Sequence, residues 1–312
     1  MKFLLQYGLI IAFSLYALVA CQAQSEAEKF RPGLTDRCVT LPAFMAQTGL
    51  KMPIAIDSRQ QAYMGLRLVE STSGETWQHP SWDDAGHVGA FVRDRHGHIY
   101  VAATPEVSLT HNPPELQNRI YRIDTKTGVM RLWLDLPGEK PSAAHPLGVM
   151  GLAYDCDTDS LYVSSIAGSN GSETKGRIYR IAVASGEIMS TLPETDVIGL
   201  GVFNDVCYKR LYLGAARSPD VYSVVLDHEG NFTRQLRHEF SLAALPEGNV
   251  TNAKKFSFRQ AQDRQYVMQV KEVNFGFRLM AENNPYKRVY NFIYQASDDA
   301  WSFRGTTPEA GF

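Results

Sequence analysis

Three histidines lie where they could act as ligands of a transition metal. His87 and His145 each come just before a short apolar segment, and His111 lies in the long polar stretch 105–118. Imidazole nitrogens are common ligands of Zn²⁺. The spacing does not support that chemistry, because the sequence contains neither H-x-x-x-H nor C-x-x-C. We therefore expect no metal site and treat these histidines as candidates for binding a ligand or partner.

A second candidate group lies in the stretch 272–288, which combines aromatic rings with cations. Its members are Phe275, Phe277, Arg278 and Tyr286. Aromatic side chains beside a guanidinium suit binding to a sugar, a peptide or a partner protein. We expect this stretch to contribute to a binding surface.

The sequence contains no recognisable catalytic motif. It lacks a G-x-S-x-G elbow, a glycine-rich phosphate loop after a strand, and an H-E-x-x-H zinc motif. A quinone-cofactor dehydrogenase is disfavoured as well, because such enzymes carry a repeated Trp-rich docking motif that this sequence lacks. We expect no cofactor. The net charge of −2 also argues against nucleic acid as a partner.

The elements that must position these residues are copies of one pattern. Residues 148–192 predict four short strands, at 149–154, 161–165, 177–182 and 187–192, separated by turn-forming residues. The first hairpin recurs at 87–104, at 197–216 and, more weakly, at 254–270. The second hairpin occurs five times along the chain. Four of its turns end in glycine, where a hairpin needs a positive φ: Gly74, Gly128, Gly186 and Gly230. The fifth turn has Ser297-Asp298-Asp299 instead.

This repeat predicts an all-β fold, a β-propeller of four-stranded antiparallel blades that bury their faces by stacking in a ring. Five blades are favoured, with CVTLPAF and MPIAIDS in residues 38–57 supplying the remaining inner hairpin. Six blades are the alternative. Two stacked β-sandwiches are the competing fold, although sandwiches do not usually repeat one pattern with the same turn chemistry.

Such a ring has two unlike faces. The hairpin turns lie on one face, the turn face, and the longer connections lie on the other, the loop face, where binding sites are usually found. The long loops are 105–118, 137–146, 166–176, 241–252 and 272–288. Cys156 and Cys207 occupy nearly the same turn of neighbouring blades. Either a disulfide between them or two separate thiols fits this placement.

The amino terminus predicts export and anchoring. Lys2 precedes an apolar run that ends at residue 20, as in a signal peptide. The tetrapeptide Leu18-Val19-Ala20-Cys21 resembles the bacterial lipobox, which implies cleavage before Cys21 and lipid on that cysteine; a transmembrane anchor is the alternative. Gln22, rather than Asp, implies the outer membrane by the sorting pattern of such lipoproteins. We assign residues 1–20 to the signal peptide, 21–36 to a lipidated tether and 37–312 to the propeller.

The string GLAYDCDTDSLYVSS, followed by GRIYRI, resembles the blade signature of gluconolactonase and regucalcin-like propellers and of other six-bladed families such as NHL. In the lactonases an Asn at the head of this strand is a metal ligand. Met150 and Ile198 stand at the matching positions here, and neither side chain supplies the oxygen that Ca²⁺ requires. The resemblance therefore predicts the fold and argues against that metal site.

These observations lead to two functional hypotheses. The first is a non-enzymatic, membrane-anchored lipoprotein of the periplasm or cell surface, which binds a protein or glycan partner through its loop face. The alternative is a lactonase-like hydrolase with a metal or polar site at the mouth of the central channel. That enzyme requires convergence of His87, His145, Asp196 and Asn252 at the heads of the inner strands.

Overall fold

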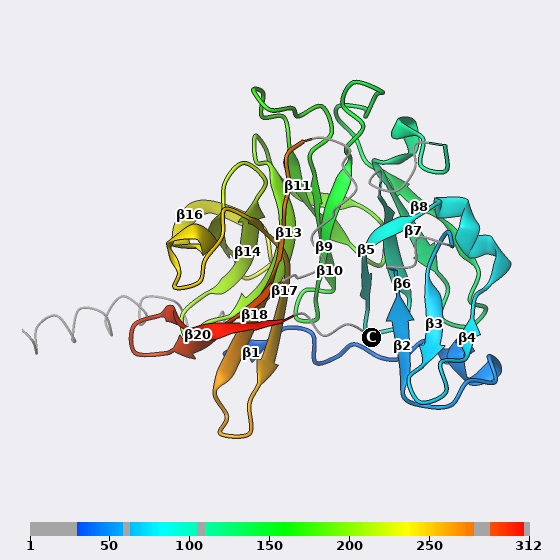
Figure 1. The fold of residues 1–312 in the computed structure, drawn as a ribbon, viewed down its shortest axis with the longest axis horizontal. Coiled ribbons are helices and arrows are strands. Elements are labelled where there is room, and N and C mark those ends of the chain that lie inside the picture. The colour runs from blue at the N-terminus through cyan, green and yellow to red at the C-terminus, as the bar shows by residue number, and fades with distance from the viewer. Residues whose placement is uncertain (1–29, 59–62, 105–109, 278–287, 309–312) are drawn as a thin grey trace, which may run out of the picture.

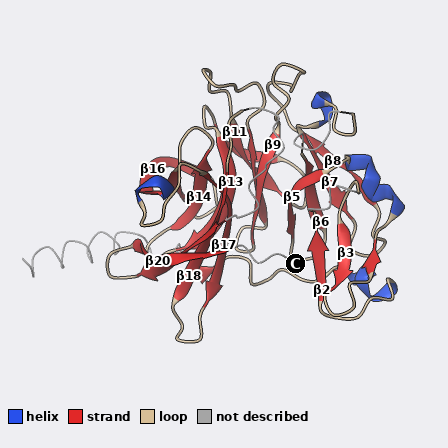
Figure 2. Ribbon diagram, in the orientation of Figure 1, coloured by secondary structure: helices blue, strands red, loops and turns tan. Residues whose placement is uncertain are grey.

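The computed structural model describes residues 30–58, 63–104, 110–277 and 288–308. Within these ranges the strands form five antiparallel sheets, which confirms an all-β propeller with five blades (Figure 1). The helices are short 3₁₀ turns outside the sheets (Figure 2): η2 (Ala43–Gln47), η3 (Pro80–Ala85), η4 (Pro114–Leu116) and η5 (Leu242–Ala244). None of the helices in the described ranges is long and apolar enough to span a membrane.

Each blade is a run of strands consecutive in the sequence, with its first strand innermost. Blade 1 has β2 (Ile54–Asp57), β3 (Arg67–Glu70) and β4 (Thr76–Trp77). Blade 2 has β5 (Val88–Arg93), β6 (Ile99–Ala103), β7 (Arg119–Ile123) and β8 (Met130–Asp135). Blade 3 has β9 (Val149–Asp155), β10 (Ser160–Ser165), β11 (Arg177–Ala182) and β12 (Ile188–Leu192). Blade 4 has β13 (Val197–Asn204), β14 (Lys209–Ala215), β15 (Asp220–Leu226) and β16 (Phe232–Ser241). Blade 5 has β17 (Asn252–Gln260), β18 (Tyr266–Val273), β19 (Arg288–Gln295) and β20 (Ala300–Pro308).

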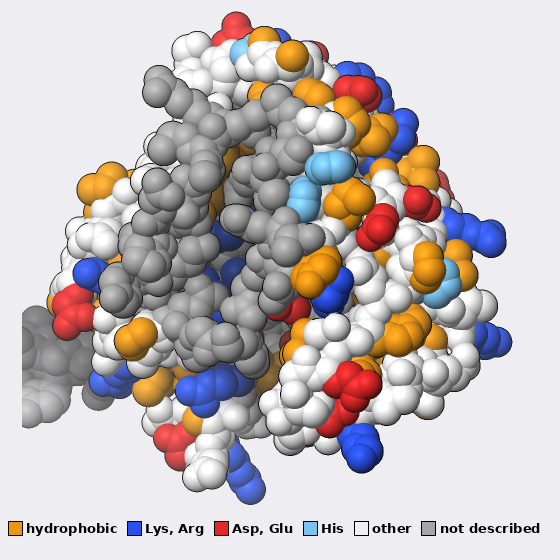
Figure 3. Space-filling model, turned by 45° about the vertical axis from the view of Figure 1, so that its right-hand side comes forward, with side chains coloured by type: hydrophobic (Ala, Val, Ile, Leu, Met, Phe, Trp, Pro, Cys, Tyr) orange, Lys and Arg blue, Asp and Glu red, His pale blue; other side chains and the backbone are white. Residues whose placement is uncertain are grey.

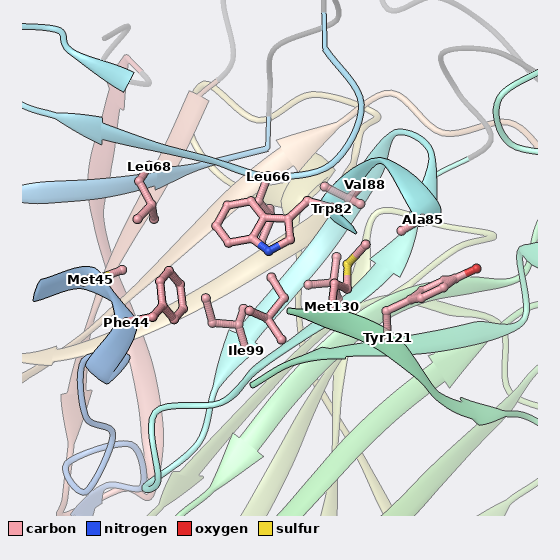
Figure 4. Packing of buried hydrophobic residues seen from close by; sticks show 12 residues of the cluster. Phe44, Met45, Leu66, Leu68, Trp82, Ala85, Val88, Ile99, Tyr121 and Met130 are labelled. Carbon is pink, nitrogen blue, oxygen red and sulfur yellow. The ribbon is translucent and has the colours of Figure 1, made fainter. Parts of the chain in front are cut away.

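Blade 1 differs from the prediction because it has three strands in the described residues. MPIAIDS supplies β2 as expected, but CVTLPAF is not a strand, and its last residues begin η2 instead. Phe44 of η2 is buried, with its ring 5.6 Å from that of Trp77 and 5.9 Å from that of Trp82 (Figure 4). Burial of this ring between the first two blades therefore outweighs the strand preference of the segment.

The turns of the second hairpins confirm the predicted chemistry. Gly74, Gly128, Gly186 and Gly230 all have positive φ, between 71° and 96°. In the last copy Asp299 takes this conformation, with a φ of 46°. Aspartate tolerates the left-handed region better than most residues, so it replaces glycine without changing the turn.

Buried tyrosines join neighbouring blades. Tyr162 of β10 has no exposed surface and donates its hydroxyl hydrogen to the carbonyl of Gly230, in blade 4, at 2.7 Å. Tyr212 of β14 is equally buried and accepts a hydrogen bond from Trp301 Nε1, in blade 5, at 2.9 Å. Each tyrosine thus buries its aromatic ring between two blades while its hydroxyl forms a hydrogen bond.

The segment 33–40, called the N-terminal strap below, crosses the turn face. Its β1 (Gly33–Leu34) pairs with β13, so residues assigned to the tether from the sequence add a strand to blade 4. Farther along, Thr35 accepts a hydrogen bond from the amide of Cys156 in blade 3, at 2.8 Å. The Thr40 amide then donates to Asp94 in blade 2. The strap therefore links three blades at one end of the ring.

A disulfide fixes the strap to blade 3. It joins Cys38 to Cys156, with the Cα atoms 5.8 Å apart, which is within the usual range. The proposed Cys156–Cys207 bond is therefore wrong, because Cys38 occupies the sulfur of Cys156. The path of the strap decides the pairing, and this path could not be read from the spacing of the cysteines.

Candidate functional site

A cavity of about 950 Å³ lies between the inner strands and has walls from all five blades. Thr35, Asp36 and Val39 of the strap line it as well. The strap therefore covers part of the cavity at the turn face. The other end of the cavity lies toward the loop face. Lys and Arg side chains are visible in the depth of the hollow in Figure 3.

The cavity wall carries charges of both signs. Four cations and four carboxylates line it: Arg93, Lys254, Lys255 and Lys271, with Asp36, Asp57, Glu70 and Glu272. Two of the carboxylates are held by donors of their own blades. Glu70 accepts from the Lys51 amide at 2.7 Å. Glu272 accepts from Thr251 Oγ1 at 2.7 Å and from the Tyr290 hydroxyl at 2.9 Å.

Near the loop face the cavity meets an apolar cluster. Met150 and Ile198 are buried in this cluster, with 4% and 0% of their surfaces exposed. Phe275 and Phe277 pack against it with their rings 5.0 Å apart. The two positions at which the lactonase resemblance implies a metal ligand are thus carbon and thioether surface, as the sequence indicated.

Arg217 ties three blades together beside this cluster. Its guanidinium lies 4.8 Å from the centre of the Phe277 ring, in the blade 5 loop. The same group donates to Asp196 Oδ2 at 2.7 Å and to the Asn170 carbonyl at 2.8 Å. Sequence reasoning missed Arg217, because no motif or spacing marks it. Of the remaining aromatic-loop candidates, Arg278 and Tyr286 lie outside the described residues.

Two residues proposed for the enzyme alternative hold the junctions between blades. Asp196 also accepts from Ser169 Oγ at 2.5 Å and from the Gly176 amide at 3.0 Å. Asn252 donates through Nδ2 to the carbonyls of Ala215, Ala216 and Ser218, and its Oδ1 accepts from the Phe275 amide. Their polar atoms therefore fix the loops in position.

The structure brings two of the three histidine candidates together. The rings of His87 and His111 lie 5.9 Å apart, with His87 buried and His111 exposed. His145 is half-buried in the loop 137–146, where its backbone pairs with that of Ser142. No three His, Cys, Asp or Glu residues of the described ranges gather as metal ligands would.

The surroundings of His87 shift the pKa of its imidazole. Burial lowers the pKa of His87, and a charge on His111 lowers this pKa further. Because the folded pKa lies below the unfolded one, stability is highest where His87 is neutral in both states, and it falls as pH drops from the unfolded pKa of about 6.5 through the lower folded pKa. Substituting His111→Asn should raise the midpoint of His87 in an NMR titration of the imidazole signals. An unchanged or lower midpoint would show that the two rings do not interact.

Comparison with known proteins finds similarity only among solved structures. No protein-family model matches the chain, and no curated protein matches it. Similar solved structures include an ancestral GH74 enzyme (TM-score 0.47, 9% identity, 77% of this chain and 38% of that one). The chain is also similar to the dihydro-heme d1 dehydrogenase NirN in complex with DHE, with a TM-score of 0.40 and 11% identity over 78% of this chain and 53% of that one. For the Dos1 propeller the TM-score is 0.39, with 10% identity over 78% of this chain and 55% of that one. The chain spans between about two fifths and just over half of these proteins' lengths.

Proposed function

We propose that this protein is a non-enzymatic, lipid-anchored propeller that binds a protein or glycan partner through its loop face. The observation that carries the proposal is the junction at Arg217, which holds loops of blades 3 and 4 beside the half-buried pair Phe275 and Phe277. Loops fixed before binding lose less conformational entropy when a partner arrives. Phenylalanine and arginine are also among the residue types enriched in protein interfaces.

The placement of β1 supports an orientation in which the loop face points away from the membrane. Cys21, the proposed lipid site, lies outside the described residues, and β1 begins at Gly33 on the turn face. A dozen residues reach at most about 40 Å when extended. An anchor at Cys21 would therefore hold the turn face toward the outer membrane and present the loop face to the periplasm or cell exterior.

The hydrolase alternative is less well supported. It needs Asp196 and Asn252 to face a substrate together with His87 and His145. The polar atoms of Asp196 and Asn252 instead hold loop backbone and Arg217 in the junctions between blades. We therefore place the binding function first.

Site-specific photo-cross-linking in intact cells tests the proposal. A photoreactive amino acid at Ser142 or Ser172, both exposed on the loop face, should yield a discrete adduct. The matched positions Lys126 and Glu229, which are exposed in turns of the opposite face, should not. Substituting both Phe275 and Phe277 by Ala should remove the adduct from protein that still melts cooperatively.

The anchor is tested with the same cells. Cys21→Ser should release the protein from the membrane fraction, whereas Ser25→Ala, in the same proposed tether, should leave it there with a lipidated amino-terminal peptide in mass spectrometry. Adducts from the turn positions alone, or a Cys21→Ser protein that still sediments with membranes, would contradict the respective part of the proposal.

A further inference from the structure

Blade 1 lacks the first strand of the repeat within the described residues. The turn at Gly74 joins β3 to β4, as the equivalent glycine turns join the third and fourth strands of blades 2 to 4. The connection 58–66 leads from β2 into β3, like the long connections between the second and third strands of the other blades. β2 is therefore the second strand of its blade, and CVTLPAF, the other half of the expected hairpin, is not a strand.

The place of this strand faces the central cavity. The first strands β5, β9, β13 and β17 pack on one another in this order, and β2 has no comparable packing on β5 or β17 in the part of the chain that the structure describes. In blades 2 to 4 the described residues that line the cavity belong to the first strands. In blades 5 and 1, on either side of the missing strand, residues of β18 and β3 line the cavity as well. A strand in this place would cover them.

The inner edge of β2 carries backbone groups that such a strand could use. β2 and β3 pair antiparallel without a bulge. Just before β2 the Pro53 carbonyl accepts from the Ser71 amide at 2.9 Å, and hydrogen-bonded pairs alternate along such a ladder. The N–H and C=O groups of Ala55 therefore point to β3, whereas those of Ile54 and Ile56 point the other way, where no described strand pairs with them. An unpaired edge is a template for a further strand.

β2 is also less buried than the second strands of blades 2 and 3. All four of its residues are only partly buried, whereas every residue of β6 and of β10 is buried. Three of the four residues of β2, with the sequence IAID, are apolar. Covering this apolar surface with another strand would remove it from water and stabilise the blade.

The cavity and the resident first strands indicate which segment fits. The four cations and four carboxylates of the wall balance in formal charge, so an uncharged segment suits it better than a strongly charged one. Small residues occupy alternate positions of β9, at Gly151 and Ala153, and of β13, at Gly199 and Gly201. A Cβ atom at Gly199 would lie 2.5 Å from the Ala253 carbonyl oxygen in the next blade. A segment in the same place of blade 1 is therefore expected to alternate small and apolar residues.

We propose that an extended, uncharged segment of a partner protein completes blade 1 by pairing antiparallel with β2 in the place of the first strand. Added strands of this kind gain affinity from main-chain hydrogen bonds. The resident first strands have between six and nine residues, which sets the length of the segment. Because the strap crosses the turn face, the segment enters from the loop face. This inference goes beyond the proposed function, since it needs neither the anchor nor the pair Phe275 and Phe277.

Peptide binding to the purified protein tests the proposal. The probe is a blocked peptide with the sequence of β13, VIGLGVFN, which is uncharged and carries a fluorophore on a soluble linker. Fluorescence anisotropy should show saturable binding. Two further peptides are N-methylated, one at its second, fourth and sixth residues and the other at its third, fifth and seventh. Only one edge of the peptide faces β2, so one methylated peptide should bind at least about tenfold more weakly and the other should keep most of its affinity.

Two results of this experiment would overturn the proposal. They are equal affinities of the two methylated peptides, and the absence of saturable binding by the unmethylated one. Binding that appears only after removal of residues 309–312, which lie outside the described ranges, would assign the place to this chain itself. A dimer that the peptide dissociates would assign it to a second copy. Either outcome would overturn the proposal of a partner protein.

Hydrogen exchange measured by NMR locates the bound peptide. The Ile56 amide should exchange at least about tenfold more slowly in the complex, whereas the Ala55 amide, already paired with β3, should change much less. Unchanged exchange at Ile56 in a saturated complex would show that the peptide binds elsewhere. Ile56→Pro removes the donor of the inner edge and keeps the bonds to β3, so it should weaken binding in protein that still melts cooperatively. If this variant does not fold, the methylated peptides decide the question with the unmodified protein. The cross-linking pattern at Ser142 and Ser172 is read independently of these results.

Discussion

Replacing Lys209 by Met is expected to lower the free energy of unfolding by about 3–5 kcal/mol. Lys209 has no exposed surface, and its Nζ lies 2.7 Å from Asp155 Oδ1 and 2.7 Å from Asp157 Oδ2. The Asp155 side chain is also fully buried. Methionine fills most of the volume of lysine but leaves a carboxylate in the protein interior without its cation. The cost comes from this uncompensated charge rather than from lost contact area.

A double-mutant cycle separates the charge effect from packing. Asp155→Asn combined with Lys209→Met removes both buried charges, and the pair should be clearly less destabilised than the sum of the two single variants. Chemical denaturation of the four proteins gives the coupling energy. Lys126→Met is a suitable control, because this exposed lysine lies in a turn of the same face, and its loss should cost less than about 0.5 kcal/mol. Strictly additive losses at Asp155 and Lys209 would contradict an ion pair that matters for stability.

The blades could be predicted from the sequence because their determinants are local. Short strands and a turn residue with positive φ recur within each copy, and the second strand of blades 2 to 5 contains a tyrosine. The last turn shows how far this holds, since Asp299 adopts the conformation that glycine has in the other four. The segment CVTLPAF could not be assigned in this way. The secondary structure of this segment depends on the packing of Phe44 against Trp77 and Trp82, more than thirty residues away in the sequence.

The site was less predictable because it is made of contacts between distant segments. The aromatic pair Phe275 and Phe277 was found from its residue types. The packing of these rings on Met150 and Ile198 depends on how the blades close into the propeller. The role of Arg217 arises only when loops of blades 3, 4 and 5 meet.

Removing the disulfide between Cys38 and Cys156 is expected to cost about 2–5 kcal/mol, with both residues changed to Ala. The bond closes a loop with a sequence separation of 118 residues, so in the chain-entropy account it restricts the unfolded ensemble strongly. It also fixes the strap, whose other connections to blade 3 include the hydrogen bond from the Cys156 amide to Thr35. The melting temperature should fall by roughly 4–20 °C, since 1 kcal/mol corresponds to about 2–4 °C in domains of a few hundred residues.

The loss of stability in the variant without the disulfide should appear first in the strap. Trypsin is expected to cleave the variant after Arg37 under conditions in which the unmodified protein resists, because a strap without its covalent bond opens locally before the blades unfold. Exposed Arg37 is present in both proteins, so the difference reports opening rather than sequence. Thr40→Ala provides the matched comparison, since it removes only the hydrogen bond of the hydroxyl to the Arg95 carbonyl and should leave cleavage nearly unchanged. Equal protease resistance and an unchanged melting temperature in the double variant would mean that β1 and its hydrogen bonds hold the strap without the disulfide.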